Sequence, residues 1–149
     1  MQKSLHGHNH PEVVFVHNCI GNIYNKRDGI DNAICSYEEA LKIYISEYGE
    51  YHSSVALTLQ NIGNLHCRLG KHDLAIQYIE KDLTTTEGIQ GSQNPDAADI
   101  LQNLGQVYAY IGRYDQSMEN LKRALDIRTQ LQQKQTSEMK RMQSMWHKL

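Results

Sequence analysis

Three copies of one 42-residue pattern follow each other in this chain of 149 residues, and the repeat constrains the fold more than any other feature of the sequence. The offset of 42 relates the glycines Gly21, Gly63 and Gly105. It also aligns the apolar residues Ile20, Ile62 and Leu104, and the acidic residues Asp31, Asp73 and Asp115. A fixed period of this length is typical of stacked structural repeats rather than of a single globular core.

Within each copy the apolar residues recur at steps of three and four, which predicts two helices per repeat. Asn94 before Pro95 predicts a helix start, because Asn caps free amide groups and Pro at the first helical position removes no needed donor. Gly70 and Gly112 suit the left-handed residue that ends a first helix. The aligned aspartates then lie where a negative charge favours the start of the second helix.

The repeat units carry a recognisable motif. It reads His17-x2-Ile20-Gly21-x2-Tyr24 with Ala33-x3-Tyr37, and Leu101-x2-Leu104-Gly105-x2-Tyr108 with Ser117-x3-Leu121. This motif resembles that of the tetratricopeptide repeat, and the period of 42 is similar to the long-helix type of kinesin light chains. The resemblance covers about residues 6–133, although the first large aromatic residue of the motif is missing from all three copies.

The resemblance implies an all-α fold, a right-handed superhelical solenoid of three antiparallel helix hairpins plus a C-terminal helix. The repeat units are residues 10–51, 52–93 and 94–133. Residues 1–9 form the end of a preceding repeat or an N-terminal extension. Residues 134–149 leave the repeat register, yet Met139, Met142 and Trp146 keep helical spacing. This segment is interpreted as a capping helix, with a basic tail and a partner-binding helix as the alternatives.

Composition narrows the classes of function. The formal net charge is −2, with 15 basic and 17 acidic residues interleaved, so no broad basic face favours nucleic acid. The three cysteines are odd in number and show no CxxC spacing, which is typical of reduced thiols and favours a cytoplasmic location. No stretch approaches the roughly 20 apolar residues that cross a bilayer, so no membrane partner is expected.

Several polar residues raise the possibility of chemistry. His66 and Cys67 are adjacent, but His66 takes the position of Tyr24 and Tyr108 in the other copies, so we interpret it as a packed side chain. His6, His8 and His10 alternate, as metal ligands on an extended segment do. Asp82 replaces the small residues of the other copies, which predicts either an escape to solvent or a loosened second repeat. We predict no catalytic residue, no metal site and no cofactor.

In the resembled family the first helix of each hairpin lines a concave groove that binds an extended peptide or a partner's helix. Projected onto this chain, the concave positions are Phe15, Asn18, Asn22, Lys26, Leu57, Gln60, Asn61, Asn64, Arg68, Gln102, Asn103, Gln106 and Tyr110. Side-chain amides dominate this set, and each offers a donor and an acceptor to a peptide backbone. The cations with which some members of the family clamp a terminal carboxylate are absent.

The sequence therefore predicts a non-catalytic protein-interaction module with a protein or peptide partner. The chain is expected to be a monomer, or to associate weakly with itself through its exposed terminal faces. One alternative is a metal-binding or enzymatic protein that uses the histidines and cysteines. Another is a scaffold segment of a larger multidomain enzyme.

Overall fold

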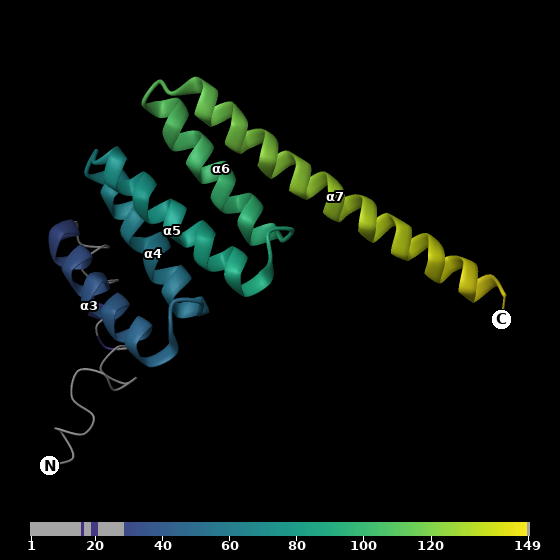
Figure 1. The fold of residues 1–149 in the computed structure, drawn as a ribbon, viewed down its shortest axis with the longest axis horizontal. Helices are drawn as coiled ribbons and strands as arrows, with labels where there is room; N and C mark the ends of the chain where they lie inside the picture. The colour runs from purple at the N-terminus through teal and green to yellow at the C-terminus, as the bar shows by residue number, and fades with distance from the viewer. Residues whose placement is uncertain (1–15, 17–18, 21–28, 149) are drawn as a thin grey trace, which may run out of the picture. The chain divides into compact units, whose positions relative to one another are not determined.

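The computed structural model describes residue 16, residues 19–20 and residues 29–148, and all regular secondary structure in them is helical. The complete helices are α3 (Ile30–Tyr48), α4 (Ser53–Arg68), α5 (His72–Gln90), α6 (Pro95–Tyr110) and α7 (Tyr114–His147) (Figure 1). The chain divides into two compact units, residues 1–89 with α3, α4 and α5, and residues 90–149 with α6 and α7. None of the described helices combines the length and apolarity needed to cross a bilayer.

The predicted helix boundaries are confirmed where they depend on local chemistry. The side chain of Asn94 accepts a hydrogen bond of 2.8 Å from the amide of Ala97, and Pro95 is the first residue of α6. Gly70 and Gly112 have φ angles of 76° and 83°, a conformation that glycine adopts without strain. The amide after each glycine bonds back to the carbonyl five residues earlier, which closes the first helix in the way expected for this motif.

In the first unit the core lies between α3 and the two helices that follow it. Tyr37 of α3 and Ile62 and Leu65 of α4 are almost fully buried together, and Tyr78 of α5 packs against them. The hydroxyl of Tyr78 also donates a hydrogen bond of 3.3 Å to Glu38 Oε1 on α3. One face of α4 is therefore covered by both α3 and α5, and its opposite face remains available.

The second unit is a pair of helices in close contact near Gly105. A Cβ atom placed at Gly105 of α6 would lie 2.7 Å from Leu121 Cγ of α7. The hydroxyl of Ser117 donates a hydrogen bond of 2.7 Å to the carbonyl of Gly105, and Ile127 is buried further along α7. A side chain at position 105 would hold the two backbones apart.

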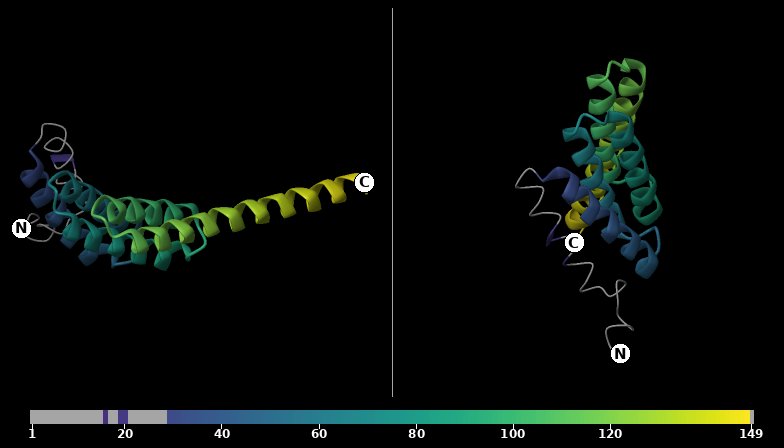
Figure 2. Two further views of the ribbon diagram at one scale, coloured as in Figure 1. Left: turned by 90° about the horizontal axis from the view of Figure 1, so that it is seen from above. Right: turned by 90° about the vertical axis from the view of Figure 1, so that its left-hand side faces the viewer.

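The C-terminal segment differs from the expected capping helix. Residues 134–147 continue α7 without a break, and α7 extends well beyond the end of α6 (Figures 1 and 2). The side chains of residues 132–148 are exposed, so this segment does not fold back over the second unit. No Gly or Pro follows Gly112, so the sequence offers nothing that would end the helix at residue 133.

Asp82 is buried in α5, so the first of the two alternatives, in which its carboxylate escapes to solvent, is wrong, and a loosened second repeat stays a prediction. The hydroxyl of Thr86, one turn later in the same helix, donates a hydrogen bond of 3.3 Å to Asp82 Oδ1. This bond satisfies part of the hydrogen-bonding capacity that a buried carboxylate needs.

Candidate protein-interaction surface

The structure places nine of the thirteen predicted groove residues on two helices. Those on α4, called the α4 row, are Leu57, Gln60, Asn61, Asn64 and Arg68. Those on α6, called the α6 row, are Gln102, Asn103, Gln106 and Tyr110. The remaining four, Phe15, Asn18, Asn22 and Lys26, lie outside the described residues.

The α4 row forms one stripe along its helix, because its members recur at steps of three and four. Leu57 is 57% exposed, and Asn64 and Arg68 are also exposed. Gln60 and Asn61 are half-buried. The buried residues of α4 lie between these positions in the sequence and include Leu59, Ile62 and Leu65. The row is thus the accessible face of a helix whose other face is fixed in the core.

The α6 row has the same character within the second unit. Gln106 is exposed, Gln102 and Asn103 are half-buried, and Tyr110 at the end of the helix is 78% exposed. One turn before the row, Asp99 Oδ1 accepts a hydrogen bond of 2.8 Å from Arg128 of α7. This ion pair is exposed on both sides, so it contributes little to stability.

The amides of the two rows are available for binding. Within the part of the chain that the structure describes, no side-chain hydrogen bond joins any of them to another residue; they are Gln60, Asn61, Asn64, Gln102, Asn103 and Gln106. A row of side-chain amides on one helix face can donate to and accept from the backbone of an added peptide. None of the described hydrogen bonds uses these amides to hold helices together, so none competes with such binding.

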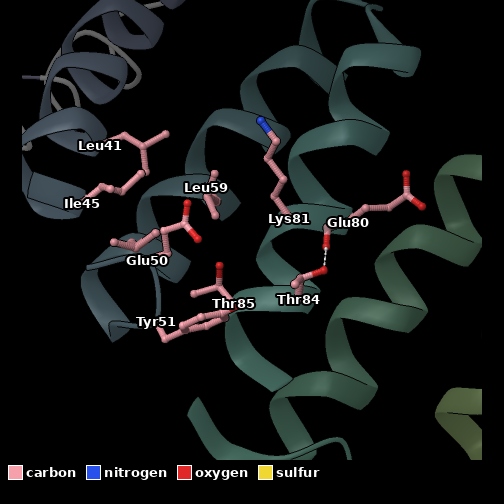
Figure 3. A pocket seen from close by; sticks show the side chains of 10 residues that line it. Leu41, Ile45, Glu50, Tyr51, Leu59, Glu80, Lys81, Thr84 and Thr85 are labelled. Atoms are coloured by element: carbon pink, nitrogen blue, oxygen red, sulfur yellow. Dashed lines mark hydrogen bonds between the residues drawn. The ribbon is translucent and has the colours of Figure 1, made fainter. Parts of the chain in front are cut away.

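A pocket of about 520 Å³ lies on a different face of the first unit (Figure 3). Its apolar lining consists of Leu41 and Ile45 of α3 and Val55 and Leu59 of α4. The remaining lining residues are Glu50, Tyr51, Glu80, Lys81, Thr84 and Thr85, from the α3–α4 connection and α5. The hydroxyl of Thr84 donates a hydrogen bond of 3.1 Å to the carbonyl of Glu80 in its own helix.

Sequence reasoning missed this pocket, because it depends on the spacing between α3 and α5 and not on one motif. Its lining combines the buried apolar side chains of Val55 and Leu59 with exposed charged side chains, a combination suited to an amphipathic side chain of a partner. The only advance signal was Thr85, a smaller residue at the position that Ile43 and Ile127 take in the other two repeats.

His66 and Cys67, the pair that raised the possibility of catalysis, take packing positions. The ring of His66 is 6% exposed and stacks on Tyr78 with ring centroids 5.4 Å apart. Burial, and then the nearby charge of Lys71, lower the pKa of His66 from its ordinary 6.5, while Glu38 opposes that shift. Burial raises the pKa of the Cys67 thiol, which is opposite to the change that activates a nucleophile.

The proposed metal ligands His6, His8 and His10 lie outside the described residues. Among the residues that the structure does describe, no group of three or more His, Cys, Asp or Glu side chains is arranged to hold a metal ion.

A comparison with known families decides the classification. The tetratricopeptide repeat model matches residues 12–84 and 54–130. The chain belongs to the tetratricopeptide repeat family. Repeats of this family are generally protein–protein interaction modules, and the all-α arrangement of helix pairs is the fold of such solenoids. No curated protein matches the sequence.

Solved structures of the same fold are similar to this chain. BtubC (BKLC) from P. vanneervenii has a TM-score of 0.77 at 25% identity over 87% of this chain and 52% of its own. A putative kinesin light chain with nearly identical TPR-like repeats from Podosopora anserina has 0.74 at 16% identity over 88% and 62%. MamA has 0.63 at 21% identity over 80% and 61%.

These likenesses support a tetratricopeptide repeat protein of the kinesin-light-chain-like type. The chain spans about half of the length of the first of these structures and about three fifths of the other two.

Proposed function

We propose that this chain is a non-catalytic protein-interaction module that uses the α4 row and the α6 row to contact an extended peptide or a partner's helix. The observation that carries the proposal is the pair of accessible amide rows on first helices of repeats. Among the described residues, His66 and Cys67, the pair that could have served catalysis, take packing positions. A cytoplasmic location agrees with three reduced cysteines.

The side chains of the α4 row limit the kind of peptide that can bind there. Gln60 and Asn64 face the same way one turn apart, so together they match the alternating N–H and C=O groups of an extended backbone. Leu57 at one end adds apolar contact, and Arg68 at the other end attracts an acidic residue. We therefore expect tolerance of sequence in the middle of the peptide, with an aliphatic or aromatic residue at one end and Asp or Glu at the other.

The α6 row repeats the amides of the α4 row but neither of its ends, and Asp99 stands at the position of Leu57. Tyr110 replaces Arg68 in the repeat register, and an exposed Tyr supplies a flat apolar surface with one polar hydroxyl. The α6 row should therefore favour an apolar or proline-containing stretch over an acidic one. Each row is expected to bind its own part of a polypeptide.

A peptide array gives the first test, with extended peptides that vary the acidic and apolar ends separately. The best binder is then measured against a variant that combines Gln60→Ala and Asn64→Ala. Each lost hydrogen bond should weaken binding by about 0.5–1.5 kcal/mol, without loss of helicity. A matched control replaces Gln77, an exposed amide on α5, by Ala.

If the double variant binds as tightly as the parent chain, and the control is also unchanged, the α4 row does not bind the peptide. A corresponding Gln106→Ala variant examines the α6 row by itself. If neither row matters and binding falls on mutation of Tyr51, the pocket of the first unit would be the binding site instead.

A further inference from the structure

Helix α7 exposes apolar residues at positions that are covered in the earlier repeats. Met118 is 54% exposed and Leu125 is 63% exposed, and Leu121 between them, one side of which packs against Gly105 of α6, is 39% exposed. Their equivalents 42 and 84 residues earlier are mostly buried; these are Ile76, Ile79, Leu83, Ile34, Tyr37 and Leu41. A face that two repeats bury is thus left open in the third.

The same face continues along the whole of α7 with a seven-residue period. Alternating steps of four and three residues connect Tyr114, Met118, Leu121, Leu125, Arg128, Gln132, Gln135, Met139, Met142 and Trp146. This series is called the α7 seam. A helix of 3.6 residues per turn drifts by about 20° per seven residues from such a series, and a left-handed supercoil with a second helix removes the drift. The period therefore suits a helix partner better than a flat surface.

The order of residues along the α7 seam is nearly symmetric. Four apolar residues come first, three polar residues stand in the middle (Arg128, Gln132 and Gln135), and apolar residues return at Met139, Met142 and Trp146. All three members of the last group are more than half exposed. Three apolar residues at each end therefore have an apolar counterpart at the other end, and only Leu125 faces a polar residue, Gln135, so the seam is largely self-complementary, as a two-fold symmetric interface requires.

Charge decides the direction of the pairing. Residues 114–126 contain three acidic and two basic side chains, whereas residues 134–148 contain one acidic and four basic. Parallel pairing would place the two basic segments side by side. Antiparallel pairing places each basic segment beside the slightly acidic one, so opposite charges attract and like charges separate.

From these observations we infer that α7 is a self-association element, on which the α7 helix of a second copy packs antiparallel through the α7 seam. The two-fold axis passes near residue 130. This register brings Met118 against Met142 of the other copy, Leu121 against Met139, and Tyr114 against Trp146. Arg128, whose guanidinium pairs with Asp99 of its own copy, lies opposite Gln132 of the other copy near the axis, and these polar residues fix the register at some expense of affinity. The inference does not depend on the proposed peptide binding of the α4 and α6 rows.

Sedimentation of the chain over a range of concentrations tests the inference. The parent should pass from monomer to dimer, and Met142→Glu should raise the dissociation constant of the dimer about tenfold or more, because it buries a charge in an apolar contact. Ser144→Glu is the matched control, since it adds the same charge two residues away, outside the seam. Both substitutions change exposed side chains, and circular dichroism verifies that α7 remains helical.

A mixing experiment tests the direction. Met118→Lys and Met142→Glu should each weaken the dimer of its own variant. In an antiparallel mixed dimer the new Lys meets the new Glu and the second contact remains Met against Met, so mixing should restore association. In a parallel dimer neither contact is repaired.

The inference is overturned if the parent chain remains a monomer at about 1 mM, a concentration at which even weak complexes form. It is also overturned if Ser144→Glu weakens the dimer as much as Met142→Glu, or if mixing the two charged variants does not restore the dimer. In the first case, the open face belongs to another protein or to a further repeat.

Discussion

The ring of Tyr51 lies against the backbone of Gly88. A Cβ atom built at Gly88 would come within 2.3 Å of Tyr51 Cδ1, closer than real atoms approach. Tyr51 belongs to the connection between α3 and α4, and Gly88 lies near the end of α5. This contact fixes the ring that borders the pocket of the first unit (Figure 3).

The first prediction concerns the coupling between these two residues. Ala is favoured over Gly in a helix by about 1 kcal/mol, so Gly88→Ala should stabilise a chain that also carries Tyr51→Ala. In the parent chain the new methyl group must displace the ring of Tyr51, and the gain should be absent or reversed. Urea unfolding of the four chains of this double-mutant cycle measures the coupling. Equal effects of Gly88→Ala in both backgrounds would show that the ring moves away without cost.

The second prediction compares Gly63 and Gly105, which hold the same position in neighbouring repeats. At Gly105 an added Cβ would meet Leu121 Cγ at 2.7 Å and the carbonyl of Ser117 at 3.2 Å, whereas at Gly63 the nearest atom is Ile79 Cγ1 at 3.0 Å. Overpacking costs about 1–3 kcal/mol. Gly105→Ala should therefore destabilise the chain by more than Gly63→Ala does, by about 1 kcal/mol.

Denaturant midpoints of the two single variants, measured with circular dichroism, check this order. The reverse order would mean that α7 shifts away from α6 more readily than Ile79 changes its rotamer. Similar stabilisation by both substitutions would show that helix propensity outweighs the close approach.

The third prediction is a pH dependence of stability from His66. Within the described residues neither ring nitrogen has a hydrogen-bond partner, and burial lowers the pKa of the folded state below the ordinary 6.5. The unfolded chain therefore binds the proton more readily. Stability from this residue is complete above about pH 6.5 and is lost as the pH falls through 6.5 toward the folded pKa.

His66→Tyr removes the titrating group and places there the residue found in the other repeats at Tyr24 and Tyr108. Tyr108 is itself buried, so a Tyr suits this position. The urea midpoint of the parent should fall relative to that of this variant as the pH is lowered from 7.5 to 5, taken as roughly the range over which a His changes charge. A constant difference over this range would contradict the assignment.

Features that depend on neighbouring residues in the sequence were predictable, and features that depend on the distance between helices were not. Asn94, Gly70 and Gly112 act within a few residues, so their caps followed from sequence alone. The pocket beside Tyr51 needs α3 and α5 at a particular separation, which no local pattern specifies. Helical periodicity predicted which face of α4 is accessible. Whether its amides form hydrogen bonds with other residues depends on the packing of the helices, which the sequence does not specify.

The end of α7 shows a different kind of error. The repeat register ends near residue 133, and this suggested a new element, but the residues after it form a helix as readily as those before it. Helix continuity is a matter of local propensity, whereas the repeat register is a matter of packing against neighbours. The two criteria separate in α7, where the helix continues beyond the last residue that keeps the repeat register.

The last prediction follows from the exposure of this extension. Side chains of residues 137–148 contact no core, so a chain that ends at residue 136 should unfold within about 2 °C of the parent at low micromolar concentration. A chain that ends at residue 126 is the matched control, because it also loses Ile127, which is 5% exposed, and should melt at a clearly lower temperature. Low concentration keeps the proposed self-association from adding to the stability of the parent. If the shorter deletion lowers the melting temperature as much as the longer one, the segment stabilises the repeats as a cap, and the extended position of α7 does not describe its role.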